Sequence, residues 1–524
     1  PVLMLQRLMI QRAVQIPIRK LVEYITKYRL PILSGLLIGT SYIPFPPWAI
    51  FFCFVPLWIF WLKQNSYKSV FWSGWTSGFI LSAIGFNWVA HTVHEFGHLP
   101  WPFAILVLIL FCSLANLHLA LVGLIWFAVC KRLQLKDSAR IWLLPLLSAV
   151  SDRAFPMIFD WHLGYTWLWA GFPAFHLADI VGFIGLANIG ALFNGFFLYA
   201  WYLRSQNRTR WIWPVAVPVV AFALMNVWGH FHGADRWVGD KIAKFLVVQA
   251  NIGNQEKLMA EQGHAYRNNV ISKFLMETSK GLADQGQADF AVWPETAFPD
   301  LIERPEMNIG YSPMLKTFVL SNKTKLITGG YTLQEGTRRI TNSFFVLGDN
   351  GEWLGKPYHK TVLLAFGEYM PFADWFPSLK KMFPEVGDFG RGPGPTVLDG
   401  GGGLKLGATI CYEGLFDWFV RDLANQGAQV IVNLTNDSWY GKWEQPFQHG
   451  YMTLARAIEV RRPLVRSTNT GISTVILADG RILALSPLHE TWSHLYQVSY
   501  AEKPEATLFM GWGYWLIPVL LLLG

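Results

Sequence analysis

Cys411 stands between two short runs whose patterns predict different secondary structures. Residues 404–410 (LKLGATI) predict a buried strand, and 414–423 (GLFDWFVRDL) has its apolar residues on one face of a helix. A thiol between a strand end and a helix N-terminus is exposed and its thiolate is favoured, as a nucleophile requires. The alternative is that Cys411 is one more small buried hydrophobe.

Three charged residues lie in apolar sequence. Glu295 follows 289–294 (DFAVWP), the end of another predicted strand. Lys360 and Glu368 lie in 355–372 (GKPYHKTVLLAFGEYMPF), where other charges are few. Isolated charges in apolar surroundings are usually paired or functional. For Glu295 the alternative is a surface carboxylate in a turn.

The composition is that of a membrane protein. Of 524 residues, 52% are hydrophobic and 15% are charged, whereas about 25% are charged in an ordinary soluble protein. The 26 Trp and 38 Phe suit a chain with two lipid interfaces to anchor. Three of the four cysteines, Cys53, Cys112 and Cys130, lie inside apolar runs, so Cys411 is the one thiol in polar sequence.

Apolar segments long enough to approach a bilayer span predict about eight transmembrane helices. They lie at 30–45, 46–62, 70–90, 102–130, 140–156, 174–202, 211–229 and 507–524. The first seven form one region, 30–229, and the last is a C-terminal helix. The net charge of +8 does not predict a nucleic-acid partner, because the basic residues form short clusters between the apolar runs.

Lysines and arginines are concentrated in every second loop, which predicts that those loops and the basic segment 1–29 are cytoplasmic. This segment lacks a small-residue cleavage site, so we expect an amphipathic helix on the inner leaflet and not a signal peptide. After seven spans, 230–506 lies on the opposite side. In a multi-pass protein of a bacterial inner membrane, that side is the periplasm.

The region 230–506 alternates strand and helix patterns, which is typical of an α/β layered domain. Strands are expected at 244–250, 289–294, 325–330, 342–348, 405–411, 428–434 and 472–478, and helices at 259–282, 312–321, 414–425 and 446–461. The run 400–403 (GGGG) lacks the ending of a phosphate loop, and the histidines lack metal-ligand spacing. We therefore expect neither a cofactor nor a metal.

These motifs together resemble the nitrilase (carbon-nitrogen hydrolase) superfamily, with Glu in W-P-E, Lys in Y-x-K-x-x-L, G-E-x-x-P, and Cys in C-Y-E. With spans on both sides, the chain resembles the apolipoprotein N-acyltransferase family. Further matching stretches are WHLGYTW (161–167), NLTNDSWYG (433–441), PFQH (446–449) and ARAIEVRRPLVRSTNTGIS (455–473). One departure is Leu258, where the family often has an aromatic residue.

The resemblance implies an α-β-β-α sandwich in which Glu295, Lys360 and Cys411 converge at strand ends. It implies that Glu295 takes the thiol proton and that Cys411 attacks a phospholipid ester to form a thioester. Lys360 and the backbone N–H of Tyr412 would hold the oxyanion.

Two acids and one loop have supporting roles in this interpretation. Glu368 is expected to orient Lys360, and Glu413 to position the loop that carries Cys411. The aromatic loop 372–389 (FADWFPSLKKMFPEVGDF) is expected to dip into the membrane interface as a lid. The alternative for this loop is a disordered surface segment.

The resemblance also implies the substrates. The acceptor is the α-amine of the N-terminal cysteine of a diacylglyceryl-apolipoprotein, and the donor is a phospholipid, phosphatidylethanolamine. Such an enzyme is expected to be a monomer that performs the final step of bacterial lipoprotein maturation. The alternatives are a membrane-tethered amidase acting on a small amide, and a transporter or scaffold, which the few charges inside the spans disfavour.

Overall fold

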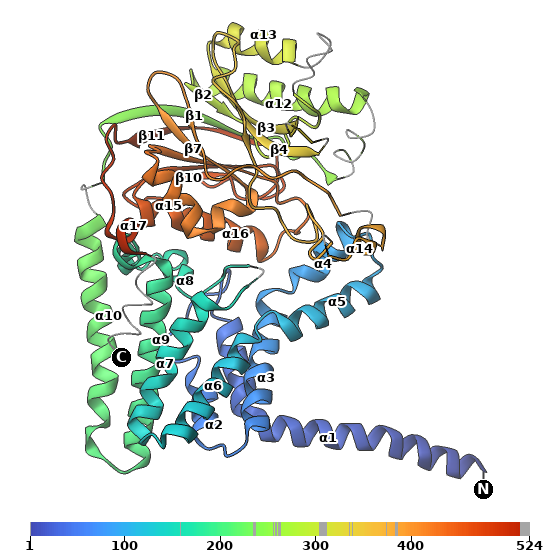
Figure 1. The fold of residues 1–524 in the computed structure, drawn as a ribbon, viewed down its shortest axis with the longest axis vertical. Coiled ribbons are helices and arrows are strands. Elements are labelled where there is room, and N and C mark those ends of the chain that lie inside the picture. Colours follow the sequence, from blue (N-terminus) through green and yellow to red (C-terminus); the bar gives the residue numbers. More distant parts are fainter. Residues whose placement is uncertain are drawn as a thin grey trace.

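The structure is a computed structural model that describes all residues except 1, 158, 234–236, 255, 257, 258, 260–263, 303–311, 335, 338, 374, 383–385 and 514–524. Leu258 and most of the predicted span 507–524 therefore lie outside the described residues. Figure 1 shows two parts, a bundle of helices below and an α/β part above it.

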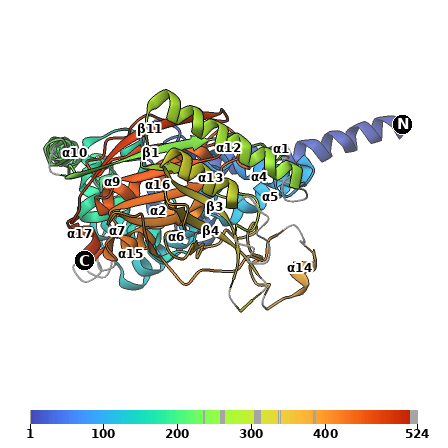
Figure 2. The ribbon, with the colours of Figure 1, turned by 90° about the horizontal axis from the view of Figure 1, so that it is seen from above.

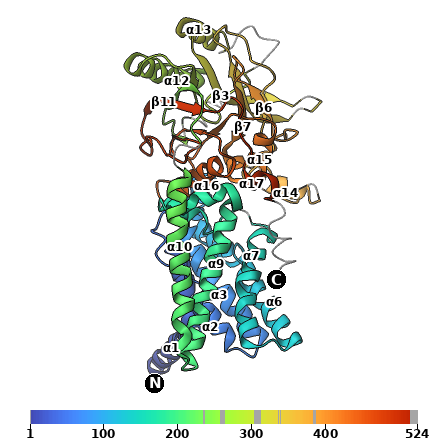
Figure 3. The same cartoon turned by 90° about the vertical axis from the view of Figure 1, so that its left-hand side faces the viewer.

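The helical part precedes residue 234. Its elements are α1 (Val2–Gly39), α2 (Val55–Leu62), α3 (Tyr67–Gly85), α4 (Trp88–Glu95), α5 (Trp101–Leu114), α6 (His118–Leu133), α7 (Asp137–Ala154), α8 (Tyr165–Trp169), η1 (Pro173–Leu177), α9 (Ala178–Ser205), η2 (Thr209–Trp211) and α10 (Ile212–Gly233). Helices α9 and α10 run side by side along the bundle, whereas the N-terminal half of α1 extends away from it (Figures 1 and 3).

Three segments of the described chain are long and apolar enough to cross a membrane, namely Trp101–Leu133, Pro173–Ser205 and Thr209–Gly233. The structure therefore does not confirm eight spans. The predicted span 46–62 is helical only in α2, because prolines at 44, 46 and 47 interrupt helical hydrogen bonding before it. The predicted span 102–130 lies within the first of the three segments, where it is divided into α5 and α6. The predicted span 70–90 falls largely on α3, which is not among the three segments. Helix α3 contains buried serines, which allow close helix packing but lower the mean hydropathy of the helix.

The α/β part contains two sheets. Their strand orders are β11-β1-β2-β3-β4-β5 and β10-β9-β8-β7-β6. The strands are β1 (Lys241–Gln249), β2 (Phe290–Val292), β3 (Lys325–Leu333), β4 (Ile340–Leu347), β5 (Tyr358–His359), β6 (Val397–Asp399), β7 (Lys405–Ile410), β8 (Val430–Thr435), β9 (Leu464–Thr468), β10 (Thr474–Ile476) and β11 (Trp492–Tyr500). All seven predicted strands are present, and β5, β6, β9 and β11 are additional.

Helices cover the outer face of each sheet. The first sheet is covered by α12 (His264–Gln285) and α13 (Ser312–Asn322), and the second by α15 (Asp417–Asn425) and α16 (Gln445–Val460). Figure 1 shows these four layers stacked above the bundle. The predicted α-β-β-α sandwich is confirmed. The strands β7, β8 and β9 are parallel and almost wholly buried, which explains the continuous apolar runs in β7 and β8.

The two parts of the molecule meet along α16, which packs against α8 and α9. Trp88 Nε1 donates to Gln448 Oε1 (3.1 Å), and Gln448 Nε2 donates to the carbonyl oxygens of Ile43 (2.8 Å) and Gly85 (2.7 Å). Helix α17 (Leu508–Trp512) also packs against α9. The N-terminal turn of α16 is therefore held by backbone and side chains of the helical part.

Candidate active site

Three strand ends bring the predicted site residues together. Glu295 lies after β2, Lys360 follows β5 and Cys411 follows β7. Lys360 Nζ donates to Glu295 Oε1 (3.1 Å) and to Glu368 Oε1 (2.8 Å). Glu295 is 6% exposed and Lys360 1% exposed, so Glu295 is not a surface carboxylate. The lysine is held between two acids.

Asn342 on β4 is a fourth member of this cluster, and nothing in the sequence marked it. Its Nδ2 donates to Glu295 Oε1 (2.7 Å) and to Glu368 Oε1 (3.3 Å). The backbone carbonyl oxygen of Asn342 accepts a hydrogen bond from the backbone N–H of Lys360 (2.8 Å). Asn342 therefore fixes both acids and the backbone of the lysine at one point of the sheet.

The charge of Lys360 follows from these neighbours. Burial alone would lower the pKa of the ammonium, but the Glu295 and Glu368 carboxylates more than offset that effect and hold the pKa well above its ordinary value. Glu368 is itself fixed, because its Oε2 accepts from the backbone N–H of Leu364 (2.9 Å). Lys360 is therefore a fixed positive charge beside the thiol and not a base.

Cys411 begins a five-residue turn of 3-10 helix, η3 (Cys411–Leu415), and has a left-handed backbone conformation with φ +51°. Its side chain is buried. Burial raises the pKa of the thiol, the Glu295 carboxylate raises it further, and Lys360 opposes this only in part. The expectation of an exposed residue with a favoured thiolate is therefore wrong. The thiol holds its proton at rest and requires a base.

Glu413 connects the turn at Cys411 to the segment that follows Lys360. Its Oε2 accepts from the backbone N–H of Ile410 (2.8 Å), and its Oε1 accepts from the Tyr358 hydroxyl (2.6 Å). The same Oε1 accepts from the backbone N–H groups of residues 361 (2.6 Å) and 362 (3.0 Å). Burial raises the pKa of Glu413 to about 7, although these hydrogen bonds act in the opposite direction.

A cavity at Cys411 has walls from both parts of the molecule. The helical part contributes four aromatic residues, Phe86, Trp88, Phe159 and Trp161. The α/β part contributes Leu364, Cys411, Tyr412, Leu415, Tyr440, Gln445, Gln448, His449 and Met452. The ring of Tyr412 packs edge-on against Phe159 (centroids 6.4 Å apart). The thiol therefore faces a mostly apolar space between the sandwich and the bundle.

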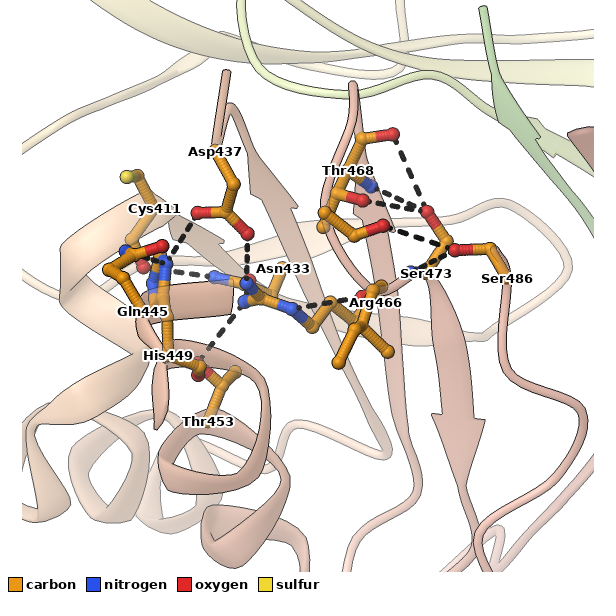
Figure 4. Close-up of polar contacts among 12 residues, drawn as sticks. Cys411, Asn433, Asp437, Gln445, His449, Thr453, Arg466, Thr468, Ser473 and Ser486 are labelled. Carbon is orange, nitrogen blue, oxygen red and sulfur yellow. Dashed lines mark hydrogen bonds and ion pairs between the residues drawn. The ribbon is translucent and has the colours of Figure 1, made fainter. Parts of the chain in front are cut away.

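A second buried polar cluster lies behind the thiol (Figure 4). Asn433 Nδ2 donates to the carbonyl oxygen of Cys411 (3.3 Å), and Arg466 Nη1 donates to Asn433 Oδ1 (2.6 Å). Arg466 Nη2 donates to Asp437 Oδ2 (3.0 Å), and Asp437 Oδ1 lies 2.7 Å from His449 Nδ1. The sequence analysis assigned these residues no role, although Asp437 follows a predicted strand end as Glu295 does. Within the described chain, no group of His, Cys, Asp and Glu could hold a metal ion.

The predicted lid is an exposed, aromatic projection. Phe372, Trp375 and Phe376 are 63%, 76% and 59% exposed. They precede α14 (Ser378–Met382), which projects to one side of the sandwich in Figure 2. Large apolar side chains exposed together mark a surface that contacts another molecule or a membrane.

Comparison with known proteins identifies the family. Residues 242–502 match the carbon-nitrogen hydrolase family, and residues 34–196 match the apolipoprotein N-acyltransferase N-terminal domain. An apolipoprotein N-acyltransferase of Bdellovibrio bacteriovorus is 45% identical over 509 residues, which cover 95% of this chain and 92% of that protein. One from Geobacter metallireducens is 30% identical over 474 residues, covering 88% of this chain and 87% of that protein.

Among solved structures, Nit3 of Saccharomyces cerevisiae, a member of branch 10 of the nitrilase superfamily, is 16% identical with a TM-score of 0.38. The match covers 51% of this chain and 93% of the Nit3 chain. The two curated relatives match nearly the whole chain, across both the helical and the α/β part. By these two relatives, the chain belongs to the apolipoprotein N-acyltransferase family.

Proposed function

We propose that this protein transfers an acyl chain from a phospholipid to the α-amine of the N-terminal S-diacylglyceryl-cysteine of an apolipoprotein, through a thioester on Cys411. The observation that carries the proposal is the cavity at the thiol, where four aromatic side chains of the helical part form one wall. Moving an acyl chain from lipid into water costs about 0.8 kcal/mol per CH₂. A cavity that opens between sandwich and bundle avoids that cost.

In the first half-reaction, Glu295 takes the proton of the Cys411 thiol, and the thiolate attacks an ester carbonyl of the phospholipid. Lys360 and the backbone N–H of Tyr412 stabilise the oxyanion, an effect worth roughly 3–4 kcal/mol per donor. The C–O bond then breaks. Glu295 returns the proton to the oxygen of the departing lysophospholipid, and a thioester remains.

In the second half-reaction, the amine of the acceptor attacks the thioester carbon. The same donors hold the oxyanion, the C–S bond breaks, and Glu295 moves a proton from the nitrogen to the Cys411 sulfur. Glu368 keeps Lys360 in place, and Glu413 keeps the turn at Cys411 against the segment after Lys360. The products are an amide and the free thiol.

The proposed arrangement is a multi-pass protein of a bacterial inner membrane with its α/β part in the periplasm. The N-terminal part of α1 would lie on the inner leaflet, and the exposed aromatics before α14 would enter the outer leaflet as a lid. A reporter fused after Trp237 should behave as exported, and one fused after Arg140 as cytoplasmic. The reverse pattern would contradict this orientation.

The proposed function is tested by incubating the purified protein with labelled phosphatidylethanolamine and a diacylated lipopeptide. We expect an amide-linked acyl chain on the lipopeptide and one lysophospholipid released for each amide formed. A membrane-tethered amidase shares the Glu-Lys-Cys cluster. Hydrolysis of small amides without acylation of the lipopeptide would favour that alternative. We propose that the active protein is a monomer, which the mass of the detergent-solubilised protein would test.

A further inference from the structure

A buried histidine shares the cavity with the catalytic thiol. His449 lies in the N-terminal half of α16, is 5% exposed, and lines the same cavity as Cys411. Its Nε2 is buried and has no hydrogen-bond partner among the described residues. Leaving a buried polar atom unpaired costs about 1–3 kcal/mol. An unpaired basic nitrogen beside the thiol therefore indicates a role in binding the substrate.

The hydrogen bond to Asp437 determines where the ring carries its proton. Burial alone would raise the pKa of Asp437, but His449 and Arg466 together lower it below its usual value. A carboxylate only accepts hydrogen bonds, so Nδ1 of His449 donates across the 2.7 Å contact. Gln445 Nε2 lies 3.5 Å from the same Nδ1. This distance is too long for a hydrogen bond that would compete with the contact to Asp437. In the neutral ring, Nε2 then presents its lone pair.

Asp437 also bonds a second basic side chain, and other titratable groups surround the ring of His449. Arg466 Nη2 lies 3.0 Å from Asp437 Oδ2, so the charge of Asp437 is already balanced without a proton on His449. The other titratable or charged groups around the ring are Tyr440 after β8, Cys411 and Tyr412 on η3, and, beyond the thiol, Glu295 and Lys360. Asp437 therefore has a cationic partner besides His449.

The proposed second half-reaction requires two proton acceptors. An α-amine has a pKa of about 7.7–8.0, so at neutral pH most of the acceptor arrives as an ammonium. Its conversion to an amide releases one proton before the nitrogen can attack and another from the nitrogen after the attack. Glu295 passes the second proton to the Cys411 sulfur. The first proton needs a different base.

We propose that Asp437 and His449 form the subsite that binds and deprotonates the α-ammonium of the acceptor, an inference that rests on the proposed function. His449 Nε2 takes one proton and becomes an imidazolium paired with Asp437. The neutral amine then attacks the thioester carbon, the C–S bond breaks, and Glu295 carries the second proton to Cys411. The imidazolium loses its proton to solvent when the product leaves.

The test separates the two half-reactions in the full-length protein. The protein is loaded with acyl chains from phosphatidylethanolamine in micelles, freed of donor, and mixed with a diacylated lipopeptide that has a free N-terminal amine. Amide formation is followed in single turnovers from about pH 6 to about pH 9, on both sides of the α-amine pKa. The variant His449→Asn keeps a nitrogen near Asp437 but has no counterpart of Nε2. His494→Asn on β11, outside the cavity, is the matched control.

We expect His449→Asn to form the acyl-enzyme at the wild-type rate, because no ammonium has to lose a proton when the thiolate attacks the ester. Its amide formation should be roughly 20-fold slower at about pH 6.5, where only about one α-amine in twenty is neutral. It should approach the wild-type rate near pH 9, where the amine is already neutral. Hydroxylamine, which is neutral near pH 7, should discharge both acyl-enzymes equally fast. His494→Asn should match the wild type throughout.

Three results would overturn this inference while the wild type remains active. In the first two, the variant transfers at the wild-type rate or is slowed equally at every pH. In the third, the variant forms no acyl-enzyme with phosphatidylethanolamine. That result would mean that His449 activates the thiol or stabilises the fold and does not act on the acceptor. If the wild type itself forms neither an acyl adduct nor an amide, the proposed function fails, and this inference fails with it.

Discussion

Two groups of side chains around Cys411 differ in origin and in chemistry. The first, which we call the polar wall although it lies outside the cavity lining, is built at strand ends of the sandwich, where Lys360 is held between two carboxylates and Glu413 is bound to the turn that begins at Cys411. The second, the aromatic wall, consists of four residues of the helical part that line the cavity. The comparison indicates that the reactivity of the thiol and the choice of a lipid substrate are set by separate parts of the chain. Mutations should therefore change the reactivity of the thiol and the preference for a lipid substrate independently.

The largest effect is expected at the nucleophile itself. Cys411→Ala should reduce both phospholipid loading and amide formation by at least about 10⁴-fold, because no other group can form the thioester. Rates are measured with labelled phospholipid, and thermal unfolding checks that the fold is kept. Cys130→Ala, in which a buried cysteine of α6 is changed, is the control and should stay active. Substantial loading of the Cys411 variant would show that the polar wall is misassigned.

The next largest effect is expected at the base. Glu295→Gln keeps the shape of the side chain but cannot take the thiol proton, so loading should slow by about 10²–10⁴-fold. Acylation by a small soluble ester such as p-nitrophenyl acetate should slow equally, since the base acts on the thiol and not on the lipid. Glu277→Gln is the control, because Glu277 is also buried but bonds Ser493 on β11. Unchanged loading in the Glu295 variant would contradict the role of this acid.

The aromatic wall should give the opposite pattern. Phe159→Ala should lower kcat/KM for phospholipid by roughly 10–100-fold, the loss expected for an aromatic contact with an acyl chain. Acylation by p-nitrophenyl acetate should change by less than about 3-fold, because a small ester does not need that wall. The control is Phe103→Ala on α5, whose ring is 59% exposed. Equal losses with both esters would mean that the two walls do not act separately.

The smallest effect concerns pH and Glu413. Burial raises the pKa of this acid to about 7, so it takes up a proton as the pH falls through that value. A protonated oxygen would meet N–H donors at residues 410, 361 and 362, and loading should slow about 5-fold, as for the loss of one hydrogen bond. Glu413→Gln should show the slower rate already at pH 8 and a flatter pH profile. The exposed Glu352→Gln should keep the wild-type profile.

Most of the sandwich could be predicted because its strands are continuous apolar runs. Strand β9 escaped prediction since Arg461 and Arg462 precede it and Arg466 lies within it, a pattern that indicates a solvated surface. All three arginines are buried and bonded to acceptors. The eight spans are not confirmed for a related reason. Hydropathy along the sequence does not show where prolines and small polar residues divide or shorten a helix.

The charged residues of the polar wall were easier to predict than Asn342, His449 and the aromatic wall. Glu295, Lys360 and Glu368 are isolated charges in apolar sequence, and Cys411 is the one cysteine in polar sequence. The structure brings the three charged residues into hydrogen-bond contact. Asn342 lies in an ordinary-looking stretch. His449 lies in the matching stretch PFQH (446–449), but nothing in the sequence indicated a role for it, because its importance comes from its distances to residues far apart in the chain. The aromatic wall was also not predicted. Trp161 lies in the matching stretch 161–167, but in a sequence so rich in Phe and Trp nothing indicated that this residue and three other aromatics line the cavity at Cys411.

The central claim is that Cys411 takes the acyl chain from phospholipid before any acceptor binds. Intact-mass analysis of the protein after exposure to phosphatidylethanolamine alone tests it most directly. We predict an added mass of one acyl chain that maps to Cys411, one lysophospholipid released per protein, and loss of the adduct on treatment with hydroxylamine. If no such adduct forms while amide appears as soon as both substrates are present, the transfer is direct and the thioester mechanism is wrong.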